Sequence, residues 1–365
     1  MKIIVYAISK NESSFVDRWV NSMNEADEIY VLDTGSSDDT VEKLKKRNVN
    51  VSVKTYNNFR FDEARNDSLA LIPKDTDLCV CTDLDEVFES GWRNKLENMY
   101  KKGINRYEYT YNWSILNGKP EISFISDKIH SRNDYIWINP VHEVLKNINN
   151  NEVRSKDETI TLNHYPDHNK SRKSYLPLLE LSVKEDPNND RNLHYLGREY
   201  MYYKKYNKAI DTLIKHIKIS SWKEEKSASM RFIARCYKNM KRYDESELWY
   251  KKAIKETPYL RDPYIEIALL KYELNEWKSI EYYVKKALKI TKHEKIYINE
   301  VFSWNEIPYD LLSLSYYYQN KYKAALKYIN KALSINNTKR LYNNKKIIKE
   351  HLNWVFLFIC NFDII

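Results

Sequence analysis

The feature that most constrains the fold of this 365-residue chain is a change of sequence pattern near residue 190. Up to about residue 165, short apolar runs alternate with helical patterns, whereas after residue 190 the strand signals stop and paired helical patterns repeat. Alternating strands and helices are typical of a mostly parallel sheet covered by helices. Repeated helix pairs are typical of a solenoid in which neighbouring units bury one another's apolar faces. We therefore expect a Rossmann-like α/β domain over 1–168, a helical linker over 169–190 and an all-α repeat domain over 191–365.

The first half contains four apolar runs that we interpret as strands. They are residues 3–8, 28–32, 49–56 and 77–82. Helical patterns lie between them at 14–23, from residue 39, and at 62–71. Asp39 and Glu42 have the spacing of a capping box, so Asp39 is expected to cap the second of these helices.

The second half shows a repeat of two helical patterns joined by a short break. The repeat occurs at 192–217, 227–256, 262–290 and 308–335, and an aromatic residue opens each second helix, namely Tyr206, Tyr243, Trp277 and Tyr322. An insertion near 293–305 stretches the last interval. The spacing resembles degenerate tetratricopeptide repeats, whose period is about 34 residues.

Charge and cysteine content restrict the classes of partner and compartment. Residues 1–170 carry 23 Lys and Arg against 28 Asp and Glu, so the net charge of +9 arises in the second half. No basic stripe is interleaved with base-stacking residues there, so we interpret the excess as a solvated helical surface and expect no nucleic-acid partner.

The four cysteines, Cys79, Cys81, Cys236 and Cys360, have no metal or disulfide spacing. Their arrangement fits a reducing compartment, and we expect a cytoplasmic protein.

We do not expect the apolar runs near the two ends of this sequence to be targeting or membrane-spanning segments. The apolar run 3–8 lacks the length and cleavage site of a signal peptide. The apolar run 354–360 is too short to span a bilayer. We interpret it as the face of a capping helix, with a peripheral membrane contact left open.

Polar motifs follow the predicted strands of the first half. Ser9 and Glu12 follow the first strand, residues 33–40 follow the second, residues 61–66 open the helix after the third, and Asp83-Leu84-Asp85-Glu86 follows the fourth. Ligands of open α/β sheets bind beyond the carboxyl ends of the strands. Closely spaced carboxylates suit hard cations such as Mg²⁺ and Mn²⁺. The sequence therefore predicts a cation and ligand site at one edge of the sheet.

These motifs carry a resemblance. Asn11-Glu12, Asp33-Thr34-Gly35-Ser36-x-Asp38-x-Thr40, Ala64-Arg65-Asn66 and Asp83-x-Asp85-Glu86 resemble those of family 2 glycosyltransferases with the GT-A fold, over residues 1 to about 165. With the tetratricopeptide-like half, the chain is similar to bacterial and phage glycosyltransferases, including peptide S-glycosyltransferases of glycocin biosynthesis. The motifs are specific for nucleotide-sugar transfer but silent about the acceptor.

The resemblance implies a UDP-sugar donor and a divalent cation, Mn²⁺ or Mg²⁺. Asp33 would accept from uracil N3–H, because only an acceptor can make that contact. Ser9 and Glu12 would line the ribose and base, and Gly35 would let the backbone approach the nucleotide. Arg65 would bind phosphate or hold an acidic neighbour. Asp83 would lie near the ribose and cation, Asp85 would ligate the cation directly, and His164 would be a late metal ligand.

The base for an inverting transfer is assigned to Glu143, with His142 positioning it or contacting the donor. The Glu-Asp base motif usual in the family is not evident in this sequence. Structural alternatives are a helix cap for Asp39, an ion pair for Arg65, a turn for Asp33, a hydrogen-bonded histidine for His164, and packing at a helix start for His142 and Glu143.

The leading functional hypothesis is a metal-dependent, inverting hexosyltransferase, with a glucose-type sugar as the first guess and the repeats presenting a peptide or protein acceptor. One alternative is transfer to a cell-envelope glycan or lipid-linked sugar, and another is an inactive interaction scaffold. A homo-oligomer is left open. Gly-x-Gly-x-x-Gly, Walker, Gly-x-Ser-x-Gly and His-Glu-x-x-His motifs do not occur, which disfavours dinucleotide, P-loop, hydrolase and zincin chemistry.

Overall fold

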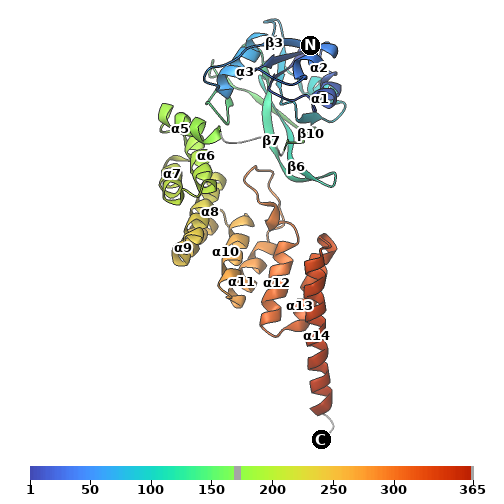
Figure 1. Cartoon of the computed structure of the whole chain (residues 1–365), viewed down its shortest axis with the longest axis vertical. Helices are drawn as coiled ribbons and strands as arrows, with labels where there is room; N and C mark the ends of the chain where they lie inside the picture. The colour runs from blue at the N-terminus through green and yellow to red at the C-terminus, as the bar shows by residue number, and fades with distance from the viewer. Residues whose placement is uncertain (168–173, 363–365) are drawn as a thin grey trace. The chain divides into compact units, whose positions relative to one another are not determined.

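The computed structural model describes residues 1–167 and 174–362, with side chains described up to residue 353. The chain forms two compact units (Figure 1). The first, here called the sheet unit, comprises Met1–Pro187 with Lys295–Tyr297, and the second, the repeat unit, begins at Asn188. Residues 168–173, at the start of the region predicted as a linker over 169–190 and just before it, lie outside the described residues. Within that region α5 spans Tyr175–Glu185.

The sheet unit is built on an eight-stranded sheet with the strand order β3-β2-β1-β4-β7-β6-β10-β5. Its strands are β1 (Ile3–Ser9), β2 (Glu28–Asp33), β3 (Asn50–Val53), β4 (Leu78–Cys81), β5 (Glu86–Phe88), β6 (Arg106–Leu116), β7 (Lys119–Ser131) and β10 (Arg154–His164). The β1–β2, β2–β3, β1–β4 and β6–β10 pairs are parallel, and the β4–β7, β6–β7 and β5–β10 pairs are antiparallel. The expected mostly parallel α/β sheet is confirmed. A separate antiparallel pair joins β8 (Tyr135–Ile138) and β9 (Val144–Asn147).

Two features of the sheet differ from the sequence prediction. The third strand ends at Val53 rather than at residue 56, because pairing with β2 stops where β2 ends, at Asp33. The long β6–β7 hairpin adds antiparallel pairing that the alternation of strands and helices did not reveal. Its turn is Asn117-Gly118, and both residues have positive φ, as the two-residue turns that suit strand twist require.

Helices cover both faces of the sheet because successive side chains of a strand point to opposite faces. Ile3, Val5 and Ala7 of β1 pack in one core with Trp19 of α1 (Val16–Met23) and with α4 (Trp92–Met99). Ile4 and Tyr6 pack in the opposite core, with α3 (Phe61–Ala70) and the β8–β9 pair.

The second helix, α2 (Thr40–Lys46), begins directly after Asp39, as expected. The Asp39 side chain makes no capping hydrogen bond to this helix, so the capping-box prediction was wrong in its chemistry. Its carboxylate instead accepts a hydrogen bond from Ser13 Oγ and forms an ion pair with Lys43. Asp39 therefore joins the loop after β1 to α2.

The repeat unit consists of antiparallel helix pairs followed by a long last helix. The pairs are α6 (Asp190–Tyr202) with α7 (Tyr206–Ile219), α8 (Lys223–Asn239) with α9 (Tyr243–Glu256), α10 (Asp262–Glu273) with α11 (Trp277–Leu288), and α12 (Ile307–Tyr318) with α13 (Tyr322–Ile335). A 3-10 turn, η1 (Val301–Ser303), lies in the insertion before α12, and α14 spans Lys339–Phe362. The predicted aromatic residue opens each second helix, and the expected helical repeats are confirmed.

Each pair turns through a residue with positive φ that is not glycine. These residues are Lys204, Lys241, Asn275 and Asn320. In the first pair, the N–H that follows this residue, that of Lys205, donates to the carbonyl of Tyr200 at 2.8 Å, which is the Schellman pattern of a helix end. The scarcity of glycine, five residues in all, is thus met by lysine and asparagine in left-handed positions.

A single glycine has a packing role within the repeat helices. A Cβ at Gly197 of α6 would lie 2.5 Å from Leu213 Cγ of α7, so the two helices approach more closely than any other residue permits.

Among the described residues, no helix is long and apolar enough to cross a membrane. Cys79, Cys81 and Cys236 are buried free thiols, and the side chain of Cys360 lies outside the described residues.

Candidate active site

The loop after β2 is organised around Asp33, which is fully buried. Its Oδ1 accepts from the backbone N–H groups of Gly35 and Ser36 at 3.0 and 2.7 Å, and its Oδ2 accepts from the hydroxyls of Ser9 and Ser36 at 2.8 and 2.5 Å. Four donors occupy the carboxylate, so a uracil N3–H could reach Asp33 only by displacing one of them. In this structure Asp33 holds the loops after β1 and β2 together.

The two loops are joined along their length by further hydrogen bonds. Asn11 donates its N–H to Ser36 Oγ and accepts from the N–H of Ser37, both at 2.8 Å, and Glu12 N–H donates to Thr40 Oγ1 at 2.8 Å. The Asn-Glu and Asp-Thr-Gly-Ser motifs are therefore one structural element. Gly35 has φ +101°, and a Cβ there would meet Thr55 Cγ2 at 3.2 Å, so glycine is required for the backbone conformation.

Arg65 projects from α3 and joins two carboxylates that are far apart in the sequence. Its Nη2 donates to Asp83 Oδ1 at 2.5 Å and its Nε donates to Glu143 Oε1 at 3.0 Å. The guanidinium also lies over the ring of Trp137, 5.5 Å from the centroid. Burial by itself would lower the pKa of Arg65, but the charge of Asp83 raises it well above its usual value. Arg65 is therefore a permanent cation between two acidic groups.

The neighbouring Asn66 explains why arginine and asparagine follow each other in the motif. Asn66 exchanges two hydrogen bonds of 2.8 Å with the backbone of Trp137 in β8. This contact fixes the β8–β9 pair, and with it the segment that carries Glu143, against α3. One turn of α3 thus supplies both the cation and the anchor.

Lys128 of β7 is a second cation at the acidic cluster, and sequence reasoning missed it. Its Nζ lies 3.5 Å from Asp83 Oδ2 and 3.8 Å from Glu86 Oε1. Although burial would raise the pKa of Asp83, the charges of Arg65 and Lys128 lower it. Burial raises the pKa of Glu86, whose carboxylate accepts from Asp83 N–H and Tyr111 Oη. Glu86 thus supports the backbone at Asp83 rather than facing solvent.

Asp85 lies beside the histidine predicted as a metal ligand. His164 Nε2 is 3.4 Å from Asp85 Oδ2, and its Nδ1 is 3.0 Å from the carbonyl oxygen of Trp113, whose ring stacks on the imidazole. A carbonyl oxygen only accepts, so Nδ1 carries a proton and Nε2 faces the carboxylate. The two electron-rich atoms then need a positive charge between them, either a proton on Nε2 or a cation.

This arrangement fits a divalent cation. Metal-bound histidines donate their second ring N–H to a carbonyl or carboxylate oxygen, as His164 does to Trp113. Burial would lower the pKa of His164, but the hydrogen bond to Asp85 raises it. Asp85 and His164 therefore form an ordered pair of a carboxylate and an imidazole at the edge of the sheet.

His142 and Glu143 lie between β8 and β9, not at the start of a helix, so the alternative of helix-start packing was wrong. His142 has φ +52°, and its ring contacts the ring of Tyr175 in α5. Glu143 exposes 12% of its side chain and is held by Arg65. The structure thus links Glu143 to Asp83 through one guanidinium.

Eight of the ten predicted site residues fall into three groups joined by hydrogen bonds or ion pairs. They come from the ends of strands and the loops after them, from α3, and from the segment between β8 and β9. Ser9, Asp33 and Gly35 form one group, Arg65, Asp83 and Glu143 a second, and Asp85 with His164 a third. The parallel order β2-β1-β4 places the loops that follow these strands at one sheet edge. Lys128 and Trp113 were missed because each lies inside a long strand of the β6–β7 hairpin, where no local motif marks it.

Comparison with protein families agrees with this geometry. Residues 4–115 match the model of glycosyl transferase family 2, and residues 232–259 and 308–339 match a tetratricopeptide repeat model. The chain thus carries a family 2 glycosyl transferase domain, which supports glycosyltransferase activity, joined to tetratricopeptide repeats.

No curated protein shows a significant match to the chain. Among solved structures, MamA is 19% identical over 48% of this chain and 98% of its own, with a TM-score of 0.38. Cut9–Hcn1 of the APC/C is 12% identical over 49% and 33%, with a TM-score of 0.40. PilF of Pseudomonas aeruginosa is 15% identical over 47% and 72%, with a TM-score of 0.38.

Proposed function

We propose that this protein is a metal-dependent, inverting glycosyltransferase that moves a sugar from a UDP-sugar to a peptide or protein. The observation that carries the proposal is the pairing of Asp85, in the loop after β4, with His164 at the end of β10. Asp85 lies within the residues that match glycosyl transferase family 2. The side chains that would handle an anionic, metal-bound donor are all at this edge. A catalytically inactive scaffold would have no reason to keep them ordered together.

Asp85 and His164 would hold the cation, with Asp83 adjoining it. When bound, Mn²⁺ or Mg²⁺ would neutralise the charge that develops on the departing diphosphate. Asp85 exposes 16% of its side chain and Asp83 exposes 38%, so both can reach a ligand without unfolding. Arg65 and Lys128 keep Asp83 ionised and oriented.

Glu143 is proposed as the base that accepts the proton of the incoming nucleophile. An inverting transfer requires a group within hydrogen-bond reach of that nucleophile. Arg65 fixes the carboxylate of Glu143, and Asn66 fixes the strand pair that carries it. His142, the adjacent residue, is proposed to position the base or contact the donor.

The repeats are proposed to present the acceptor. Tetratricopeptide-like units stack into an extended binding surface, and several of their tyrosines, including Tyr202, Tyr282 and Tyr318, expose more than half of their surface. Exposed tyrosine favours recognition of a polypeptide. A cysteine-containing peptide is the first acceptor to test, because the resemblance includes peptide S-glycosyltransferases.

The test is UDP release from a panel of UDP-sugars with Mn²⁺ or Mg²⁺, together with intact-mass analysis of candidate peptides. Asp85→Ala should raise the activation barrier by several kcal/mol, which lowers the rate about 10³-fold. The matched control is Asp75→Ala, since Asp75 is an exposed carboxylate paired with Lys2. Equal rates for wild type and Asp85→Ala would refute the metal assignment. Wild-type protein that bound neither UDP nor Mn²⁺ in calorimetry would support the scaffold alternative.

A further inference from the structure

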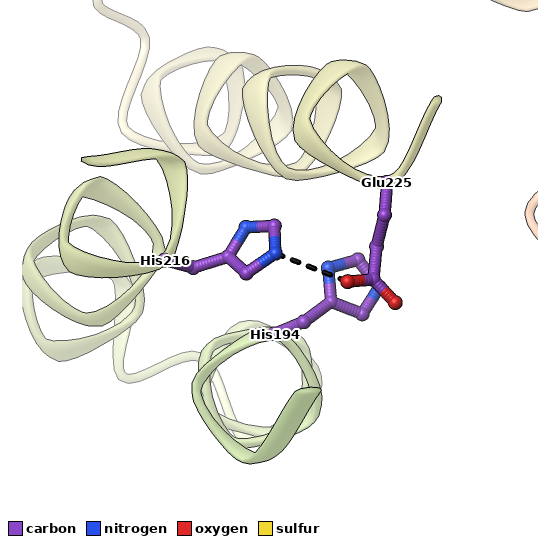
Figure 2. Close-up of side chains that lie close together, drawn as sticks. All are labelled: His194, His216 and Glu225. Carbon is purple, nitrogen blue, oxygen red and sulfur yellow. Dashed lines mark hydrogen bonds and ion pairs between the residues drawn. The ribbon is translucent and has the colours of Figure 1, made fainter. Parts of the chain in front are cut away.

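A buried group of two histidines and a glutamate lies in the repeat unit, apart from any residue used above. His194 comes from α6, His216 from α7 and Glu225 from α8, and Figure 2 shows the three side chains converging between the helices. Their ligand atoms all lie within 4.8 Å of one another. His194 and His216 are fully buried and Glu225 nearly so, which is unusual for these residue types unless they serve each other or a ligand.

The two imidazoles are oriented by one hydroxyl. Ser229 Oγ lies 2.8 Å from Nδ1 of His194 and 2.9 Å from Nδ1 of His216. His216 Nε2 lies 3.1 Å from Glu225 Oε2. Because Nδ1 of each ring contacts Ser229, Nε2 is the nitrogen through which each histidine would bind a ligand.

We propose that His194, His216 and Glu225 form a zinc site that joins the first three helices of the repeat unit. Imidazole and carboxylate are both good zinc ligands, and two histidines with one glutamate form a known type of ligand set. Three protein ligands leave a fourth tetrahedral position, which water would occupy.

The proton arrangement suits this assignment. A hydroxyl oxygen has two acceptor lone pairs, so Ser229 Oγ can accept from both Nδ1–H groups. Each histidine then presents a lone pair at Nε2, and Ser229 supplies the hydrogen-bond partner that metal-bound histidines normally have. Without the cation, His216 Nε2–H donates a hydrogen bond to Glu225, and His216 Nδ1 accepts one from the Ser229 hydroxyl.

The distances require only small adjustments. Tetrahedral zinc with bonds of 2.0–2.1 Å places its ligand atoms roughly 3.3 Å apart. The nitrogen of His216 and the oxygen of Glu225 are already 3.1 Å apart. Other separations in the group are at most 4.8 Å, so the widest would close by about 1.5 Å through rotation of side chains.

The alternative is a metal-free hydrogen-bond chain from His194 through Ser229 and His216 to Glu225. Glu225→Gln separates the two possibilities. The amide oxygen of glutamine can still accept from His216 Nε2–H, so the chain is preserved, whereas the anionic zinc ligand is lost. His351→Gln is the matched control, because His351 is an exposed histidine on α14.

The experiment uses the full-length, tag-free protein in an Asp85→Ala background, so that the candidate active site does not compete for zinc. Protein stripped with EDTA is titrated with ZnCl₂ in calorimetry, and retained zinc is measured by mass spectrometry after gel filtration. We expect one zinc per chain and a higher melting temperature with zinc, with both retained in His351→Gln. Cobalt in place of zinc should give the visible bands of tetrahedral coordination.

Glu225→Gln should keep the far-UV circular dichroism and melting temperature of the zinc-free protein but lose at least 100-fold in zinc affinity. Ser229→Ala should lose about 10-fold, as expected for a partner that orients a ligand. A background protein that retains no zinc, or a Glu225→Gln variant that binds it equally well, would overturn the proposal. Neither outcome bears on sugar transfer, which is measured separately.

Discussion

Both units bury charged side chains, but the two sets differ in their exposure. In the sheet unit, Arg65 exposes 3% of its side chain while its partner Asp83 exposes 38%. In the repeat unit, Arg231 and its partner Glu266 expose 1% and 2%. A charge that has a partner and still reaches solvent can act on a ligand, whereas a fully enclosed pair can act only on its neighbours. Exposure thus distinguishes a candidate site from a structural ion-pair network. A list of the charged residues alone would not distinguish the two.

The two sets also differ in how they are assembled. Glu266 of α10 accepts from Arg231 and Arg235 of α8 at 2.8 Å, and Glu300 adds a second carboxylate beside both arginines. This network fastens the second repeat to the third. The sheet-edge cluster instead gathers Arg65, Asp83, Lys128 and Glu143 from four separate elements or loops.

The largest expected effect tests the role of the partly exposed cluster at the sheet edge, to which Glu143 belongs. Glu143→Gln should lower kcat by 10²–10⁴-fold, roughly the contribution of a general base, and leave KM for the UDP-sugar nearly unchanged. Steady-state kinetics with a saturating acceptor measure both parameters. A variant with normal kcat and raised donor KM would show that Glu143 positions Arg65 instead of accepting a proton.

The next largest effect tests the network of Arg231, Arg235 and Glu266 in the repeat unit. Glu266→Ala leaves the buried guanidinium of Arg231 and the partly buried one of Arg235 without their main carboxylate. The free energy of unfolding of the repeat unit should therefore fall by about 3–5 kcal/mol. Urea denaturation followed by hydrogen exchange assigns the transition to this unit. Glu273→Ala, which removes an exposed partner of Lys238, should cost less than about 1 kcal/mol. Equal costs for the two variants would erase the proposed distinction.

A third prediction concerns His130, a buried histidine of the sheet unit. Trp137 Nε1–H donates to Tyr6 Oη, Tyr6 donates to His130 Nε2, and His130 Nδ1–H donates to the carbonyl of Ser131. This chain requires a neutral ring, and burial lowers the pKa of His130 to about 3.

Because the unfolded pKa is near 6.5, the unfolded chain binds a proton that the folded one excludes between pH 6.5 and 3. The stability associated with His130 is therefore complete above pH 6.5 and decreases by about 1.4 kcal/mol for each unit below it, or about 2 kcal/mol at pH 5. Urea denaturation at pH 7 and pH 5 should show this loss in wild type and a smaller one in His130→Gln. Identical pH dependence in both proteins would contradict the neutral assignment.

The smallest effect concerns the turns of the repeats. Lys204 has φ +58°, a conformation that is costly for a side chain with a Cβ. Lys204→Gly should therefore stabilise the repeat unit by about 0.5–1 kcal/mol after the entropy cost of glycine. Asn320→Gly should gain less, since asparagine tolerates this region better. Thermal unfolding of both variants gives the ranking, and a larger gain at Asn320 would argue against backbone strain as the cause.

Local sequence patterns predicted much of the fold. The apolar run of β1 and the aromatic residue at the start of each second helix identified elements whose periodicity is set within about ten residues. The β6–β7 hairpin was missed, because its long strands carry mixed apolar and polar residues and its antiparallel pairing with β4 depends on segments about 50 residues apart. The capping role of Asp39 failed for a similar reason, since Ser13 from another loop competes for its carboxylate.

The sequence by itself determined the residue types at the strand ends and the order of the two kinds of domain. Those features follow from short-range periodicity and from motifs a few residues long. Only the tertiary structure decided which carboxylates remain exposed, that Arg65 joins Asp83 to Glu143, and that Ser229 orients two histidines from different helices. The reason is physical: exposure and hydrogen-bond geometry depend on what packs against a side chain, and those neighbours lie 13 to 78 residues away along the chain.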